Sequence, residues 1–222
     1  MGEAHLNNSA TSASRIFDTL RQDLVNGRFE AGEKIAINVL KDHYQVGLSP
    51  LREALNRLAA YGLLMQENQR GFRVLSLDRR ELNDIAEMRR ELETMALERA
   101  IRLGDAEWES ELLAAAHRLK RADQSPEEVD QWELMHTRYH RTLVSGCGSV
   151  WLLRFIDQLH DQFDRYRRMA PSVPQVRQVL DGQHGELVDL ALARDVKKAR
   201  ALLENHIQLS YEVALGSCKD RY

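Results

Sequence analysis

Apolar residues recur at helical spacing in three short segments near the start of the chain. The first segment is residues 14–26, which Gly27 ends. The second begins at Asn38, whose side chain can cap a helix. The third begins at Ser49, which we expect to be the N-cap, with Pro50 as the first helical residue. Its apolar stripe lies along one face: Leu51, Ala54, Leu55, Leu58 and Ala59.

Alternating apolar and polar residues replace the helical pattern after this third helix. Residues 63–67 and 71–75 read as two short strands joined by a turn, which predicts a β-hairpin. Two helices joined by a tight turn and followed by a hairpin form a winged helix-turn-helix, whose second helix enters the major groove of DNA. The pattern therefore predicts a DNA-binding domain over residues 14–75. The alternative is the same fold used for protein contacts.

The rest of the chain keeps the helical period and shows no strand pattern. Asp78 and Glu81 resemble a capping box at the start of a helix that extends to about residue 103. We expect further helices, separated by turn and capping residues, over residues 106–122, 127–145, 149–169, 176–193 and 196–215. The chain is thus expected to be mostly α. A winged helix-turn-helix with a small hairpin wing would be followed by an all-helical bundle over residues 78–216.

Composition and charge indicate where in the cell these two domains work and how the first would bind DNA. Residues 1–13 are polar and small, which predicts a disordered arm and not a signal peptide. No apolar run is long enough to cross a membrane, and Cys147 and Cys218 make no disulfide framework, so we expect a cytoplasmic protein. Residues 1–75 hold nine Lys and Arg against eight acidic residues, and the remainder holds 22 against 26. A weakly basic head favours a dimeric reader of DNA over a nonspecific coat.

Four histidines of the helical half are spaced so that one metal ion could bind them all. His136 and His140 are four residues apart, which places both rings on one face of a helix. His184 and His206 lie on two further predicted helices. Because neutral imidazoles suit these ions, we predict one divalent metal, Zn²⁺ or Ni²⁺. The alternative is four polar residues that pair with acids or line a cavity. We expect the other histidines at the surface: His5, His43, His117 and His160.

The N-terminal pattern resembles a known family. The stretch P-L-R-E-A-L-N-R-L-A-A-Y-G-L and the flanking residues of 14–75 are similar to the winged helix-turn-helix of GntR-type bacterial regulators. The resemblance implies that the third helix contacts DNA and that the wing tip approaches the minor groove. The family commonly has Arg where Leu48 stands, and Leu cannot donate to a guanine edge, so the usual operator is not expected. The candidate DNA contacts are Asn38, Ser49, Pro50, Arg52, Arg70 and Gly71.

The helical half resembles the FCD effector domain of the FadR subgroup of those regulators. Matching stretches include H-T-R-Y-H-R-T-L at 136–143 and H-G-E-L-V-D-L-A-L-A-R-D at 184–195. The first is most similar to the branch that contains the glutarate-responsive carbon-starvation repressor. The resemblance implies metal ligands at His140, His184 and His206, and it places His136 where metal-binding members carry Asp. Arg89 matches an arginine that lines the effector pocket, although it could instead form a surface ion pair with Glu93.

These expectations combine into one hypothesis about function. The protein would be a metal-containing transcriptional regulator, most simply a repressor, that binds palindromic operator DNA as a homodimer. We expect a pocket walled largely by Leu, Met and Phe, in which four neutral ligands leave the ion uncompensated. A small carboxylate, for example glutarate or another dicarboxylate, would then join the ion beside Arg89 and release the DNA.

Two other functions fit parts of the pattern. One is a metal-dependent hydrolase with a DNA-binding head, and the other is a sensor whose effector is the metal itself. A hydrolase needs a general base beside the metal-bound water, and the sequence offers neither HExxH nor a carboxylate placed for that role. We therefore do not expect an enzyme.

Overall fold

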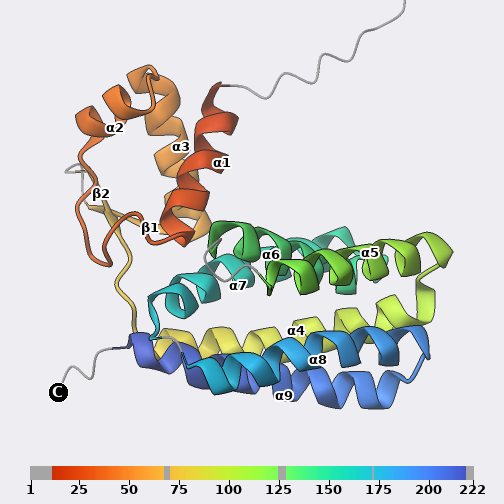
Figure 1. Ribbon diagram of the computed structural model, residues 1–222. Helices are drawn as coiled ribbons and strands as arrows, with labels where there is room; N and C mark the ends of the chain where they lie inside the picture. The colour runs from red at the N-terminus through yellow and green to blue at the C-terminus, as the bar shows by residue number, and fades with distance from the viewer. Residues whose placement is uncertain (1–11, 68–70, 125–128, 172, 219–222) are drawn as a thin grey trace, which may run out of the picture. The chain divides into compact units, whose positions relative to one another are not determined.

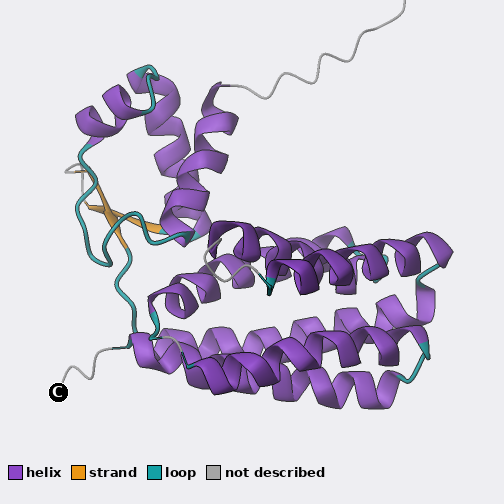
Figure 2. Ribbon diagram, viewed as in Figure 1, coloured by secondary structure: helices purple, strands orange, loops and turns teal. Residues whose placement is uncertain are grey.

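The structure, a computed structural model, describes residues 12–67, 71–124, 129–171 and 173–218. These residues are mostly helical, and the strands that they contain form one hairpin (Figure 2). The chain divides into two compact units, Met1–Leu77 and Asp78–Tyr222. The predicted fold class, a small winged helix-turn-helix followed by a helical domain, is confirmed. Most of the predicted arm lies outside the described residues, but its last two residues, Ser12 and Ala13, already belong to the first helix.

The described residues of the first unit form three helices and the hairpin (Figure 1). Its elements are α1 (Ser12–Val25), α2 (Ile37–His43), α3 (Leu48–Tyr61), β1 (Leu64–Glu67) and β2 (Gly71–Val74). The strands are antiparallel, with Leu64 opposite Val74. The predicted stripe of α3 packs into the core with residues from α1 and the hairpin, chiefly Ile16, Leu20, Leu51, Leu55, Leu58 and Phe72. The opposite face of α3 is therefore left for contact with a partner.

Helices α2 and α3, like α1, begin earlier than the sequence predicted. Ala36 is the N-cap of α2, so Asn38 lies inside the first turn and is not the cap. Gly47 is the N-cap of α3, so Ser49 and Pro50 are both first-turn residues. Neither observed cap supplies a side-chain hydrogen bond. At α3 the prediction failed because Gly costs only a few tenths of a kcal/mol relative to Ser at an N-cap, and Pro is tolerated in the first turn.

The second unit is a bundle of long helices (Figure 1). Its elements are α4 (Arg79–Leu103), α5 (Ala106–Ala122), α6 (Val129–Ser145), α7 (Val150–Met169), α8 (Pro174–Leu192), α9 (Val196–Ala214) and a short 3₁₀ turn, η1 (Leu215–Ser217). These bounds lie close to the predicted ranges, although the predicted start of α6 at residue 127 falls outside the described residues. Ser149 and Asp195 cap α7 and α9 by accepting backbone N–H bonds. Within the described residues, no helix is both long and apolar enough to cross a membrane.

Helix α4 packs against α6, α7 and α9, and a polar link joins its first turn to α7. Asp78 caps α4 as predicted, accepting from the backbone N–H groups of Arg80 and Glu81. The return bond of a capping box is absent from this turn. Instead the Asp78 N–H donates to the Tyr166 hydroxyl at 3.2 Å, and that hydroxyl donates to the Glu81 carboxylate. The link joins the C-terminal part of α7 to the start of α4, so the two helices run antiparallel.

Candidate metal centre and effector pocket

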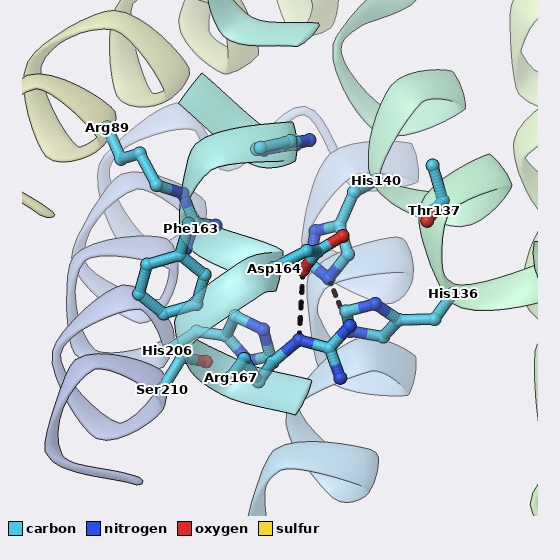
Figure 3. Close-up of a pocket in the computed structure, with 10 residues that line it drawn as sticks. Arg89, His136, Thr137, His140, Phe163, Asp164, Arg167, His206 and Ser210 are labelled. Carbon is cyan, nitrogen blue, oxygen red and sulfur yellow. Dashed lines mark hydrogen bonds and ion pairs between the residues drawn. The ribbon is translucent and has the colours of Figure 1, made fainter. Parts of the chain in front are cut away.

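The four predicted histidines come together from three helices of the second unit. His136 and His140 project from α6, His184 from α8 and His206 from α9. One ring nitrogen of each lies within 4.8 Å of the other three. The Nε2 atoms of His136 and His140 are 3.1 Å apart (dashed in Figure 3). A tetrahedral ion with metal–nitrogen distances of about 2.0–2.1 Å separates its ligand atoms by roughly 3.4 Å. The cluster therefore has the dimensions of a single-ion site after small adjustments.

Burial keeps these rings neutral, as metal ligands must be. It is the largest cause that lowers the pKa values of His136, His140 and His184 well below the ordinary value, and it lowers that of His206 to about 4. Both ring nitrogens of His184 are buried without a hydrogen-bond partner among the described residues. An unsatisfied buried polar atom costs about 1–3 kcal/mol. A bound ion would remove that cost for the one nitrogen that coordinates it, so the donor set fits a metal.

A group outside the cluster orients one of the rings, that of His206, and another bond ties the helices beside the ligands. The Nδ1 of His206 lies 3.1 Å from the amide oxygen of Gln183, and the Gln183 amide donates to Asn205 at 2.7 Å. An N–H on Nδ1 that donates to Gln183 leaves the Nε2 lone pair of His206 for an ion. The backbone carbonyl of His184 accepts a bond of 2.8 Å from the buried Tyr139 hydroxyl, which ties α8 to α6 beside the ligands. Second-shell partners of this kind are usual at metal sites.

A small cavity adjoins the histidines (Figure 3). Its volume is about 20 Å³, which is room for about one water molecule. The expectation of walls made largely of Leu, Met and Phe is wrong, because Phe163 is the one such residue in the lining. The lining consists of Arg89, His136, Thr137, His140, His160, Phe163, Asp164, Arg167, His206 and Ser210. The apolar residues of these helices instead form the core on their other faces.

Arg89 lies in this lining and also pairs with Glu93, so both predicted roles share one location. Its Nε donates to the Glu93 carboxylate at 2.6 Å, but the pair is buried and is not the surface bridge that the spacing suggested. Its Nη1 is buried with no hydrogen-bond partner among the described residues, and its guanidinium lies 4.2 Å from the centre of the Phe163 ring. An arginine with a free, buried N–H beside a cavity is suited to bind a carboxylate.

His160 was expected at the surface, and this is wrong. The side chain is buried on α7, its Nε2 lies 2.9 Å from the Glu93 carboxylate, and its ring centre is 5.9 Å from that of His140. His43 and His117 are exposed as expected, while His5 lies outside the described residues. The spacing of polar residues along α7, at 160, 164 and 167, was a signal for an inward polar face that could have revealed it.

A second buried ion cluster borders the cavity, and the sequence did not indicate it. The Nε of Arg167 donates to Asp164 at 3.0 Å (Figure 3), and the same guanidinium donates to Glu133 of α6. Arg168 also reaches Glu133, at 3.5 Å. Burial alone would lower the pKa of Arg167, but the Asp164 and Glu133 charges outweigh it and raise that pKa. The cluster therefore keeps its charges although it is buried.

The candidate DNA contacts of the first unit are largely exposed. Ser49 and Arg52 lie on the solvent side of α3, opposite its buried stripe, and Asn38 is exposed on α2. Pro50 is half-buried, and Arg70 lies outside the described residues. Gly71 has a φ of +116°, a conformation that favours glycine, where β2 begins. Ser49 and Arg52 thus share one open helix face.

Comparison with known proteins gives matches to both units. The family described as "Bacterial regulatory proteins, gntR family" matches residues 12–74, and the FCD domain matches residues 84–209. The HTH-type transcriptional repressor GlaR of Escherichia coli (strain K12) is 38% identical over 196 residues, which cover 85% of this chain and 89% of GlaR. The HTH-type transcriptional regulator BphR of Paraburkholderia xenovorans (strain LB400) is 38% identical over 202 residues, covering 89% and 82%.

A solved structure shares the fold. Escherichia coli McbR/YncC superposes with a TM-score of 0.82 and covers 93% of this chain and 98% of that one, at 21% sequence identity. At this identity the likeness concerns the fold alone. The matched families and relatives are transcriptional regulators and not enzymes, which removes the hydrolase alternative.

Proposed function

Since the chain belongs to the GntR family of bacterial regulatory proteins and carries an FCD domain, we propose that it is a metal-containing repressor released from its operator by a small carboxylate. That it regulates transcription by binding DNA, and that its FCD domain binds a small molecule, follow from the family. The metal, the effector class and the dimer are the proposal. The observation that carries it is the buried four-histidine cluster beside the Arg89 cavity.

The metal would be one divalent ion held by four neutral imidazoles. Zn²⁺ and Ni²⁺ suit this donor set, and His136 supplies an imidazole where metal-binding members of the family have a carboxylate. The ion would provide a positively charged centre at the cavity wall. The residues of the chain would orient the ligands, through Gln183 on His206, and would exclude bulk water by burial.

Charge supports an anionic effector, although by a different route from the apolar pocket expected above. The charged groups that line the cavity, or are joined to its lining by a chain of ion pairs, are three arginines and three carboxylates: Arg89, Arg167, Arg168, Glu93, Glu133 and Asp164. Their formal charges cancel. A divalent ion among neutral histidines would therefore leave two uncompensated positive charges in a buried site, which is costly. A dicarboxylate would neutralise them. One of its carboxylates would lie near the ion, and the other could accept the free N–H of Arg89, which lines the same cavity.

The dimer is proposed from the operator and from an exposed apolar surface. A palindrome is read by two heads, and one weakly basic head makes few phosphate contacts. The second unit has an exposed apolar patch, defined here as Leu103, Val150, Trp151 and Phe155, each of which is more than half exposed. Trp151 and Phe155 are one turn apart on α7. A two-fold axis would pair this patch with itself in a second copy of the chain.

The metal is tested by elemental analysis of the purified protein, for which we expect about one divalent ion per chain with the single-site geometry. His140→Ala and His184→Ala should lose the metal, whereas the control His117→Ala, an exposed histidine on α5, should keep it. Wild-type metal content in the first two variants would refute the site.

The effector is tested by titration calorimetry with a series of mono- and dicarboxylates that includes glutarate. We expect dicarboxylates to bind the metal-loaded protein, to bind the chelator-treated protein more weakly, and to reduce its affinity for operator DNA. Equal binding with and without metal would show that the carboxylate does not use the ion. Release of DNA on addition of the metal alone would instead support the metal sensor.

A further inference from the structure

One candidate ligand is less buried than the others. His136 is half-buried, whereas His140, His184 and His206 are buried. His206 is oriented by a hydrogen bond to Gln183. In the described part of the chain, the hydrogen-bond contact that the His136 ring makes is with His140, itself a candidate ligand. Among the described residues, no hydrogen bond from outside the cluster orients this ring, and the same is true of His140 and His184.

The indole of Trp132 lies flat against His136. The two residues are one turn apart on α6, their ring centres are 4.6 Å apart, and their planes differ by 20°. This is a stacked arrangement, and rotation of the imidazole out of its plane would break it. Stacked aromatic pairs of this kind add attraction beyond the area that they bury.

Trp132 is itself held in place by charged groups. Its indole N–H donates to the Asp123 carboxylate at 2.5 Å, at the end of α5. The Arg177 guanidinium from α8 lies 4.3 Å from its ring centre, and that of Arg167 from α7 lies 5.6 Å away. Only 7% of the side chain is exposed. Helices α5, α7 and α8 thus all contribute to fixing one indole.

We propose that Trp132 is a positioning residue that holds the His136 imidazole by stacking, so that its Nε2 faces the other three ligand atoms. The inference rests on the proposed metal site. Metal-bound histidines are usually oriented by a hydrogen bond from their second ring nitrogen to a carboxylate or carbonyl. At His136 the stacked indole replaces that bond. The fourth imidazole therefore depends on a neighbouring aromatic residue, which a carboxylate in the same position would not need.

Trp132 also packs in the hydrophobic core, so its removal could weaken metal binding by disturbing the fold. A double-mutant cycle separates the two roles. Zn²⁺ affinity is measured by competition with a chromophoric chelator for wild type, Trp132→Leu, His136→Asp and the double variant, with circular dichroism to verify that each is folded. Trp132→Phe, which keeps a stacking ring, is the conservative variant.

We expect Trp132→Leu to weaken Zn²⁺ binding by about tenfold, as loss of a second-shell partner does, and Trp132→Phe to restore most of it. With His136→Asp, which has no ring to stack, Trp132→Leu should have no further effect. An equal loss in both backgrounds would assign Trp132 to the core alone and overturn the inference. Unchanged Zn²⁺ affinity in Trp132→Leu would also overturn the inference, but it would leave the proposed metal site intact. A wild-type protein that binds no Zn²⁺ would instead refute the proposed function.

Fluorescence tests a separate premise of the inference, that the ion binds beside the indole of Trp132. The other tryptophans are Trp108 and Trp151, neither of which stacks on a candidate ligand. Co²⁺ bound to His136 should quench Trp132 strongly, because the indole lies against that ligand. The quenched fraction should largely disappear in Trp132→Phe and persist in the matched control Trp151→Phe. Equal quenching in both variants would show that the ion does not bind beside the indole and would overturn the inference.

Discussion

The buried carboxylate of Glu93 should make the stability of the second unit depend on pH. Only 2% of the residue is exposed, and it faces the Arg89 guanidinium at 2.6 Å and His160 at 2.9 Å. Burial alone would raise the pKa of this carboxyl, but the charges of Arg89 and His160 outweigh it and lower the pKa from 4.5 to about 2. A pKa that is lower in the folded state means that ionised Glu93 stabilises the fold above pH 4.5. This contribution is lost as the pH falls through 4.5 toward 2.

The size of the effect follows from the shift. A difference of about 2.5 pKa units corresponds to about 3 kcal/mol at neutral pH. At pH 3 less than half of this stabilisation remains, because Glu93 is already protonated in the unfolded chain. Glu93→Gln keeps the shape of the side chain and removes the charge. We therefore expect it to lower the free energy of unfolding by about 3 kcal/mol at pH 7 and by much less at pH 3.

Urea unfolding followed by tryptophan fluorescence measures this, because all three tryptophans lie in the second unit. The protein is treated with chelator so that metal release does not contribute. Glu98→Gln is the matched control on the same helix. Glu98 pairs near the surface with Arg102 and Arg200, and such pairs contribute at most about 1 kcal/mol. A difference between wild type and Glu93→Gln that stays constant from pH 7 to pH 3, or grows on acidification, would refute the reasoning.

Three further predictions concern the head and the dimer. Tyr44→Phe should destabilise the first unit by about 1–3 kcal/mol, because the buried Asp23 carboxylate loses the hydroxyl that donates to it. An unchanged thermal unfolding curve, followed by circular dichroism, would contradict this. Arg52→Ala should weaken operator binding by about 1–3 kcal/mol if Arg52 reads a base, and an equal loss on unrelated DNA, seen by anisotropy, would make it a phosphate contact instead. Trp151→Glu should convert the dimer to monomer in sedimentation experiments, and an unchanged dimer would place the interface elsewhere.

The helices could be predicted from the sequence because their causes are local. The apolar stripe of α3 and the caps at Ser149 and Asp195 depend on residues within one or two turns. The start of α3 could not be predicted as well. Its first turn contains both a strong capping residue, Ser49, and a proline, and the observed start uses neither in its preferred position. A difference of a few tenths of a kcal/mol between candidate caps is too small to read from sequence.

The candidate site was only partly predictable from the sequence. The residues that were missed are those whose role depends on partners far away in the chain. Histidine spacing and family resemblance identified His136, His140, His184 and His206. Of the charged groups around them, Arg89 was identified by the resemblance, but those of α7 were missed, because the faces of α7 are decided by its packing against α4, α6 and α9. His160 reads as a surface residue until Glu93 is placed 2.9 Å away. The buried pair of Glu133 and Arg167 likewise joins residues 34 positions apart.

The size of the cavity determines what effector binding must do to the fold. A volume of about 20 Å³ holds about one water molecule, and a carboxylate group alone is larger than that. Binding of the proposed carboxylate would therefore require the site to open, and α7 is the helix that contributes most to its wall, through His160, Phe163, Asp164 and Arg167. The same helix carries Trp151 on the proposed dimer surface. Because packed helices move as units, a shift of α7 that admits the effector would also alter that surface, and a coupling of about 1–3 kcal/mol suffices for regulation.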